Sequence, residues 1–163
     1  IVMFSTPDLS DQNDDAKVIE LSFNHYGSIK SFHGQIETAI CPDDNSYVKE
    51  ILEENGNNRL LFVDGSKSMK CALLGDMLAA KAIDNNWSGI VINGCVRDVE
   101  ILSSLSIGIM AIASSPKRSE KKGQGSRSET LNFGNTSINR NDWAYCDQNG
   151  ILISTKELNF KSK

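Results

Sequence analysis

The middle of the chain alternates short apolar runs with segments of helical periodicity, and this pattern constrains the fold more than any other feature. The runs at residues 59–65, 88–93 and 108–114 are apolar on successive positions, as strands buried on both faces of a sheet are. Residues 76–86 and 97–105, which lie between them, have the spacing of helices. Strands joined by helices in this order pair in parallel. The sequence therefore predicts an α/β fold with a central parallel or mixed sheet.

The two ends of the chain are richer in short β segments. We expect a short N-terminal helix, and a second helix that starts at Asp43 or Asp44 and ends at Gly56. Residues 115–128 are polar and predict a mobile loop. The remaining predicted strands have alternating or apolar patterns and comprise residues 17–23, 31–40, 129–139, 142–147 and 150–154.

Composition excludes several classes of protein. With no repeats or linkers, residues 1–163 are predicted to form one globular domain. The formal net charge of −4 and the pI near 5.2 argue against direct, non-specific binding of nucleic acid. The longest apolar runs, such as residues 90–92, are too short to cross a membrane. We therefore expect neither nucleic acid nor a membrane as a partner.

The sequence also predicts the roles of the cysteines, the histidines, the tryptophans and one basic cluster. The four cysteines form no CxxC pair and no signal peptide is visible, so we expect free thiols and a cytoplasmic location. His25 and His33 are isolated and predict structural or surface roles, and Trp87 and Trp143 predict packing. Five cations lie among Ser, Gly and Glu and predict a solvated loop; they are Lys117, Arg118, Lys121, Lys122 and Arg127.

Two predicted helices begin where parallel α/β proteins bind ligands, after the carboxyl ends of strands. The first opens with GDML at residues 75–78, whose free backbone N–H groups suit a carboxylate. The second opens with Arg97 and Asp98, and twenty residues separate Arg97 from the aspartate of the first. If the strands are neighbours, both helix starts face one pocket, whose candidate residues are Gly75, Asp76, Met77, Leu78, Arg97 and Asp98.

These side chains suit a keto acid and a divalent cation. Arg97 can hold a planar carboxylate through two parallel hydrogen bonds, which lysine cannot do. Asp98 offers a hard oxygen ligand, and magnesium commonly takes only one or two protein carboxylates and keeps several waters, one of which Asp76 can hold. A structural alternative stays open. The helix dipole stabilises acids in a first turn by about 0.3–1 kcal/mol, and Arg97 can pair with either acid at the surface.

Several ordered segments resemble one known family. They span about residues 6–154 and include TPDLSD, FHGQIETAICPDDN, RLLFVDG, GDMLAAKAIDNNWSGIVINGCVRD and NFGNTSINRNDWAYCDQNGILIS. Their order is similar to that of the regulator of ribonuclease E activity A (RraA-like) proteins and their enzyme relatives, the 4-hydroxy-4-methyl-2-oxoglutarate aldolases. The spacing of Asp76, Arg97 and Asp98 matches the signature of the enzyme branch in register.

The resemblance implies a fold, an assembly and roles for the site residues. The implied fold is a three-layer β/β/α sandwich of the swivelling-domain type, and the implied assembly is a homotrimer with sites at subunit boundaries. The implied cofactor is Mg²⁺ or Mn²⁺. By analogy the substrate-binding residues are Gly75, Asp76, Met77, Leu78 and Arg97, the catalytic residues are Arg97 and Asp76, and the metal ligand is Asp98.

The activity implied by the resemblance is that of a class II, metal-dependent aldolase. It would cleave 4-hydroxy-4-methyl-2-oxoglutarate to two pyruvates and decarboxylate oxaloacetate, because both reactions pass through the enolate of pyruvate. Lys67, Lys70 and Lys81 are candidates only under a rival Schiff-base mechanism. The alternative function is a non-catalytic inhibitor of ribonuclease E-type RNA degradation that binds a protein partner. That regulator branch lacks the acid after the arginine, so Asp98 favours the enzyme branch.

Two features depart from the family pattern. The loop after residues 59–65 reads DGSKS instead of a glycine-rich run and places Ser66 and Lys67 near the expected site, with Lys67 expected to point into water. Retro-aldol cleavage also needs a base, which the family draws from an acid near a longer C-terminus of a neighbouring subunit. Glu157 in a short tail is the candidate here. Decarboxylation needs no such base and is expected to be the more robust activity.

Overall fold

The computed structural model describes residues 4–160. Its helices are α1 (Thr6–Gln12), α2 (Ser46–Leu52), α3 (Asp76–Asp84) and α4 (Val99–Leu102). Its strands are β1 (Lys17–Val18), β2 (Asn24–His25), β3 (Phe32–Ile40), β4 (Leu60–Asp64), β5 (Ala72–Leu74), β6 (Gly89–Val96), β7 (Gly108–Ser114), β8 (Ser126–Arg127), β9 (Leu131–Phe133), β10 (Thr136–Ile138), β11 (Trp143–Asp147) and β12 (Gly150–Ser154).

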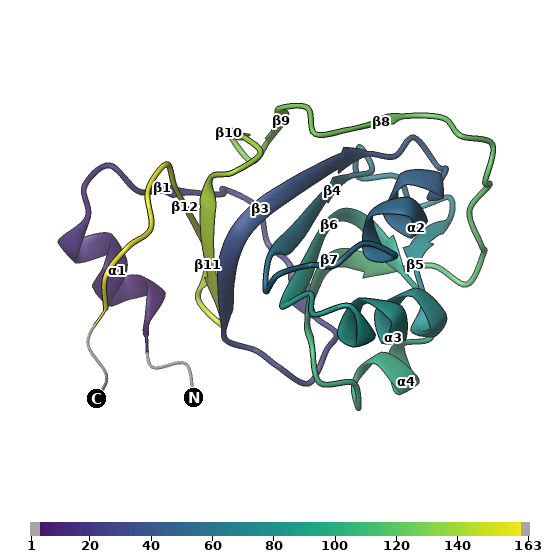
Figure 1. Cartoon of the computed structure of the whole chain (residues 1–163), viewed down its shortest axis with the longest axis horizontal. Coiled ribbons are helices and arrows are strands. Elements are labelled where there is room, and N and C mark those ends of the chain that lie inside the picture. Colours follow the sequence, from purple (N-terminus) through teal and green to yellow (C-terminus); the bar gives the residue numbers. More distant parts are fainter. Residues whose placement is uncertain (1–3, 161–163) are drawn as a thin grey trace.

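One large mixed sheet organises the chain (Figure 1). Its order is β1-β12-β11-β3-β4-β6-β7-β2, with β5 beside β6 and β8 beside β3. Neighbours in the series β3, β4, β6 and β7 pair in parallel, and helical segments connect β4 to β6 and β6 to β7. The predicted α/β class with a central parallel or mixed sheet is therefore confirmed. No helix among residues 4–160 has the length and apolar character that crossing a membrane requires.

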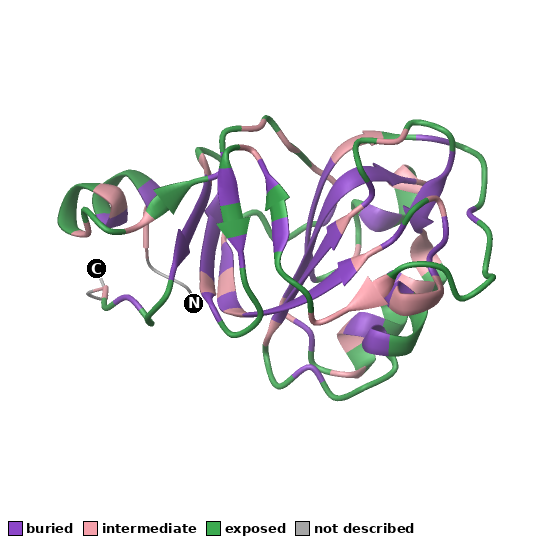
Figure 2. Ribbon diagram, turned by 90° about the horizontal axis from the view of Figure 1, so that it is seen from above, coloured by how far each residue is buried: buried purple, intermediate pink, exposed green. Residues whose placement is uncertain are grey.

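Hydrophobic cores lie on both faces of this sheet, and buried residues follow its central strands (Figure 2). Alternation along β4 shows the division. Leu61 and Val63 belong to the core beneath α2, α3 and α4, whereas Leu60 and Phe62 belong to the core beneath the β9–β10 hairpin. Helices thus cover one face and β structure the other, which confirms the predicted three-layer β/β/α sandwich. A smaller third core joins α1 to β11 and β12.

Strand β3 joins the parallel and antiparallel parts of the sheet. Its residues 32–35 pair antiparallel with β11, and its residues 36–40 pair parallel with β4. All nine of its residues are buried or half-buried, because it lies between the two parts. The parallel unit that carries α3 and α4 is therefore connected through β3 to β11, β12 and β1, while β2 pairs with its other edge at β7.

Several predicted boundaries are wrong for identifiable reasons. The predicted strand 17–23 forms only β1, because the chain turns at Ile19 and its side chain enters the core beneath β9–β10. Helix α2 begins after Asn45 and ends at Leu52, so neither Asp43 nor Asp44 is its cap. The predicted helix 97–105 begins two residues late, as α4, because Asp98 adopts a left-handed conformation with φ of 59°, and it ends at Leu102. Strand β5 was not predicted, since three residues give too little pattern.

The polar loop after β7 is held by hydrogen bonds along its length. The Asp44 carboxylate, in a residue only 1% exposed, accepts the backbone N–H groups of Lys122 (2.6 Å) and Gln124 (3.3 Å). The Ser46 hydroxyl accepts the N–H of Gly123 over 2.9 Å. Burial raises the pKa of Asp44, but hydrogen bonds from Ser46, Lys122 and Gln124 outweigh that effect and leave the pKa lowered. The loop is therefore polar as predicted, and its centre is docked on the start of α2.

We expect Asp44→Asn to lower the free energy of unfolding by roughly 1–3 kcal/mol at pH 7, because the amide group offers one acceptor where the carboxylate offers two. A carboxyl group whose folded pKa is depressed stabilises the protein above its unfolded pKa of about 3.9 and loses that contribution as the pH falls through the folded value. Urea unfolding at pH 7 and below pH 4 should therefore show the difference shrinking in acid. Exposed Asp14→Asn serves as control, and a pH-independent difference would contradict the role given to the charge.

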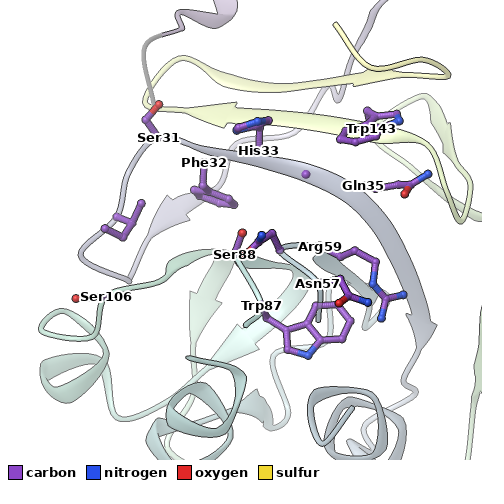
Figure 3. A pocket seen from close by; sticks show the side chains of 13 residues that line it. Ser31, Phe32, His33, Gln35, Asn57, Arg59, Trp87, Ser88, Ser106 and Trp143 are labelled. Carbon is purple, nitrogen blue, oxygen red and sulfur yellow. The ribbon is translucent and has the colours of Figure 1, made fainter. Parts of the chain in front are cut away.

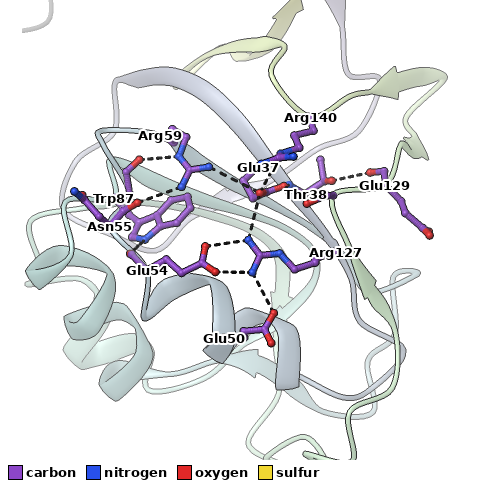
Figure 4. Close-up of polar contacts among 12 residues, drawn as sticks. Glu37, Thr38, Glu50, Glu54, Asn55, Arg59, Trp87, Arg127, Glu129 and Arg140 are labelled. Carbon is purple, nitrogen blue, oxygen red and sulfur yellow. Dashed lines mark hydrogen bonds and ion pairs between the residues drawn. The ribbon is translucent and has the colours of Figure 1, made fainter.

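A fully buried carboxylate lies in the middle of β3. Glu37 accepts hydrogen bonds at Oε1 from the backbone of Thr38 (2.8 Å) and from Ser128 (3.1 Å). Three guanidinium groups surround its Oε2, at 3.3 Å for Arg140, 3.4 Å for Arg127 and 3.8 Å for Arg59 (Figure 4). We call these four side chains the Glu37 cluster.

The Glu37 cluster corrects one sequence expectation. Arg127 was predicted to be a solvated loop cation, but its side chain is only 26% exposed and also pairs with Glu50 (3.1 Å) and Glu54 (2.7 Å) of the α2 region. These pairs raise the pKa of Arg127 and lower that of Glu54. The other four cations of the predicted loop cluster are exposed, as expected.

Candidate active site

The ends of β5 and β6 bring the predicted site residues together. Leu74, the last residue of β5, is paired with Val96 at the end of β6, and the Arg97 N–H donates to the Leu74 carbonyl over 2.9 Å. Gly75 then caps α3, and Asp98 caps α4. The two helix starts that the sequence singled out are therefore neighbours at the carboxyl end of the parallel strands.

Asp98 contacts the start of α3 directly. Its Oδ2 accepts the backbone N–H of Asp76 over 3.0 Å, at a helix end where such groups have no intrahelical partner. A β-carbon built on Gly75 would lie 2.6 Å from the same oxygen. A side chain at position 75 would therefore displace the Asp98 carboxylate, which passes close to the backbone there.

Further N–H groups of α3 are available to a ligand. The first backbone bond of the helix runs from the Ala79 N–H to the Gly75 carbonyl over 3.1 Å. Within residues 4–160, no hydrogen bond uses the N–H groups of Met77 or Leu78. Met77 is 81% exposed, so its side chain points away from the core. Two backbone donors thus lie beside Asp98, in the positive end of the helix dipole.

The Arg97 guanidinium forms no ion pair with any residue in the described part of the chain. Over the described part of the chain, its one polar side-chain contact is a 3.5 Å hydrogen bond from Nη1 to the carbonyl of Pro116. No ion pair joins it to Asp76 or Asp98 within those residues, which argues against the structural alternative of a surface pair. Arg97 is half-buried as a residue, and its guanidinium keeps donors for a planar anion.

Other candidates near the site have mostly structural contacts. Lys67 is exposed, as expected, and its N–H donates to the Asn93 carbonyl over 3.1 Å. Lys81 is exposed on α3 and lies 3.8 Å from Glu53, which is not the dry setting of a Schiff-base lysine. Burial raises the pKa of the Cys95 thiol, so it is not an activated nucleophile. Glu157 follows β12, and its neighbour Leu158 shares a core with Leu9 of α1; in the same chain, α1 and β12 lie far from α4 (Figure 1).

The donor set fits magnesium or manganese better than zinc. Among residues 4–160 no three His, Cys, Asp or Glu side chains gather to hold a metal, as a structural zinc site would require. A hard cation that keeps most of its waters needs only one or two carboxylates. Asp98 meets that need, because Oδ1 receives no hydrogen bond from the described residues while Oδ2 is fixed by Asp76.

A separate pocket lies at the opposite end of the parallel strands (Figure 3). Its volume is about 880 Å³, and its lining includes His33, Asn57, Arg59, Trp87 and Trp143. The guanidinium carbon of Arg59 lies 4.8 Å from the centre of the Trp87 ring, and the indole N–H of Trp87 donates to the Glu54 carbonyl, so both side chains have structural partners. No residue of the predicted site lines this pocket.

Comparison with known proteins decides the family. A family model described as RraA-like, aldolase/RraA, matches residues 6–153. The chain belongs to the RraA-like family. Among curated members, a protein of Pseudomonas syringae pv. tomato is 46% identical over 95% of this chain and 96% of its own length, and one of Pseudomonas putida is 44% identical over the same shares. Both carry the provisional name 4-hydroxy-4-methyl-2-oxoglutarate aldolase.

Two solved structures extend the comparison to the RraA-like fold. The RNA-processing inhibitor RraA from Thermus thermophilis has a TM-score of 0.94 and 33% identity, over 99% of both chains. A protein from Geobacillus kaustophilus, named as an S-adenosylmethionine:2-dimethylmenaquinone methyltransferase, has a TM-score of 0.94 and 38% identity, over 95% of this chain and 97% of its own. RraA-like chains thus carry names from several functional classes, and function has to be argued from the site.

Substitution of Gly75 tests the geometry of this RraA-like site. We expect Gly75→Ala to lower divalent-cation affinity by at least about tenfold, the scale seen when groups that orient a metal ligand are changed, because the methyl group displaces the Asp98 carboxylate. Gly94→Ala in β6 is the control, since its added carbon would meet nothing closer than 3.4 Å. Cation titration followed by calorimetry measures the difference. Equal affinity in both variants would contradict the close approach of Asp98 to residue 75.

Proposed function

We propose that this RraA-like protein is a divalent-metal-dependent lyase that forms pyruvate from 4-hydroxy-4-methyl-2-oxoglutarate and from oxaloacetate. One observation carries the proposal. The Asp98 carboxylate is hydrogen-bonded to the start of α3 and lies next in sequence to an arginine that forms no ion pair with any described residue. The candidate cation ligand Asp98, the candidate carboxylate clamp Arg97 and the free N–H groups of α3 thus lie together at the ends of β5 and β6. The names of the curated relatives support the same activity.

Each group has a role that its position supports. Arg97 would hold the substrate carboxylate through parallel hydrogen bonds, and the N–H groups of Met77 and Leu78 would orient the keto acid. Asp98 would hold Mg²⁺ or Mn²⁺, with Asp76 orienting a bound water. The cation would supply a Lewis acid for the charge that develops as the enolate of pyruvate forms.

The two reactions differ in their need for a base. Retro-aldol cleavage requires removal of the substrate hydroxyl proton. Glu157 of the same chain follows β12, a strand that lies far from α4 and its cap Asp98 (Figure 1). In the homotrimer that we propose, a neighbouring subunit would supply that base. Decarboxylation of oxaloacetate loses CO₂ without removing a hydroxyl proton, so it would proceed with Arg97, Asp98 and the cation alone.

Pyruvate release tests the proposal. We expect the purified protein to release pyruvate from both substrates in the presence of Mg²⁺ or Mn²⁺, and to lose the activity when a chelator is added and regain it with excess cation. Arg97→Lys should raise KM more than it lowers kcat, since lysine cannot make both parallel hydrogen bonds. Activity that survives thorough chelation would overturn the metal-dependent mechanism.

A second candidate function is regulation of a ribonuclease E-type enzyme through protein binding. It is favoured by the likeness to the RNA-processing inhibitor RraA over 99% of both chains. The acidic net charge fits a partner with basic segments, and such binding should weaken as salt rises. Capture of a purified ribonuclease E-type protein that persists in Asp98→Asn, together with absent lyase activity in the wild type, would favour this function.

A further inference from the structure

The loop that follows β7 crosses the end of β6 at the proposed site. Near its end β6 lies between β5 and β7, with Cys95 paired to Ala72 on one side and to Ala113 on the other. The Ser115 N–H donates to the Val96 carbonyl over 2.9 Å, beside β6. By residue 118 the chain has reached β5, where Arg118 forms a parallel bridge with Ala72.

Residues 116 and 117 therefore pass over the carboxyl end of β6. The Pro116 carbonyl accepts the hydrogen bond of the Arg97 guanidinium, and the Lys117 carbonyl accepts the N–H of Ala72 over 2.8 Å. Ala72 belongs to the strand that leads into Gly75. The loop thus contacts both strands whose ends carry the site.

Hydrogen bonds before and after residues 116–117 hold this part of the loop over the end of β6. Upstream, Ser115 is bonded to β6. Downstream, the buried Asp44 carboxylate holds the backbone of Lys122 and Gln124 on the start of α2. The Asn45 N–H also donates to the Glu120 carbonyl over 3.1 Å. The crossing segment is therefore held against the site edge at several points.

Lys117 and Arg118 bring two unpaired charges to this place. Both are exposed, and within the described residues neither forms an ion pair, whereas Lys122 farther along the loop lies 3.8 Å from Glu120. Burial raises the pKa of the Cys71 thiol, in the residue before β5, and the charge of Lys117 partly opposes that rise. The first turns of α3 and α4 carry acids, Asp76 and Glu100, so a second cationic side chain besides Arg97 would come from another segment.

We propose that Lys117 and Arg118 bind the second carboxylate of the substrate and make the site selective for 2-keto acids with two carboxylates. The inference rests on the proposed function, in which Arg97 and the cation take the carboxylate beside the keto group. Both proposed substrates carry another carboxylate, and an anion beside Asp76 and Asp98 requires compensating positive charge. The loop crossing supplies it at the site edge.

Binding of two probes tests the inference. Pyruvate and 2-oxoglutarate share the 2-keto carboxylate head, and only the second has another carboxylate. Calorimetry with Mg²⁺ present would compare wild type, Lys117→Gln/Arg118→Gln and the matched control Lys121→Gln/Lys122→Gln, which removes the same charge from the same loop near α2. We expect the first variant to weaken 2-oxoglutarate binding by about tenfold, the scale of a lost charged hydrogen bond, and to change pyruvate binding by less than about twofold. The control should leave both affinities unchanged.

Several results would overturn the inference. Equal weakening of pyruvate and 2-oxoglutarate would show that the two residues only hold the loop. Equal weakening in the control variant would show a general effect of charge. Unchanged binding of 2-oxoglutarate in the Lys117/Arg118 variant would remove the subsite. Failure of the proposed function is distinguishable, because wild-type protein would then bind neither probe.

Discussion

Asp98→Asn should lower kcat/KM for pyruvate release from oxaloacetate by at least about 100-fold, the loss typical when a group that stabilises developing negative charge is removed. Asparagine has nearly the same size and tolerates the left-handed backbone at this position, so the loss reports on the carboxylate charge and not on the fold. The Asp76 N–H can still donate to the amide oxygen. Initial rates at saturating Mg²⁺ and a parallel cation titration would measure both quantities.

The first turn of α4 provides a control variant. Glu100→Gln removes an exposed carboxylate two residues away, and we expect it to change kcat/KM by less than about threefold, as exposed charges beyond direct contact are largely screened. Thermal unfolding of both variants should stay close to wild type. If Asp98→Asn retained more than a tenth of wild-type activity with unchanged cation dependence, Asp98 would not be the metal ligand.

Glu37→Gln is expected to lower the free energy of unfolding by about 3–5 kcal/mol, because it leaves three guanidinium groups around a buried site without their central anion. A domain of this kind has a total stability of only about 5–15 kcal/mol. The variant should therefore unfold at a much lower urea concentration, which circular dichroism or tryptophan fluorescence would follow.

An exposed pair gives the matched comparison for Glu37. Glu53→Gln breaks the 3.8 Å contact with Lys81, in which both side chains are nearly half exposed, and should cost no more than about 1 kcal/mol. A loss below about 1 kcal/mol for Glu37→Gln as well would contradict the role of the Glu37 cluster. It would mean that water or backbone movement satisfies the three arginines.

The sequence predicted best where one local pattern determines the structure. β7 has the predicted bounds, and β4 and β6 lie where predicted, because strands buried on both faces are continuous apolar runs. Helix α3 begins at the predicted residue, since Gly75 and Asp76 are typical of a helix start and Ala79 and Ala82 mark its buried face. Gly75 and Arg97 lie side by side, as the sequence predicted, because β5 leads into α3 next to the end of β6.

Features that depend on distant residues could not be predicted. The carboxylate of Glu37 in an otherwise apolar strand indicated a buried polar group, but no spacing connects it to Arg59, Arg127 and Arg140. Asp44 looked like a helix cap. One of its carboxylate oxygens does bind Ser46 at the start of α2, but the partners of the other oxygen lie almost eighty residues later in the loop. No local sequence pattern predicts that the loop crosses over β6 either, because its path depends on which strand the chain pairs with next.

The two-sided pairing of β3 has a consequence for slow motions of the molecule. Since β11 is bonded to residues 32–35 and β4 to residues 36–40, neither flank can open without exposing amides of this one strand. Amide hydrogens of β3 should therefore be among the slowest to exchange with deuterium, and those of the short edge strands β1 and β2 among the fastest. Fraying of β1, β12 and β11 would then stop at β3 before it reaches the strand ends that carry Gly75 and Asp98.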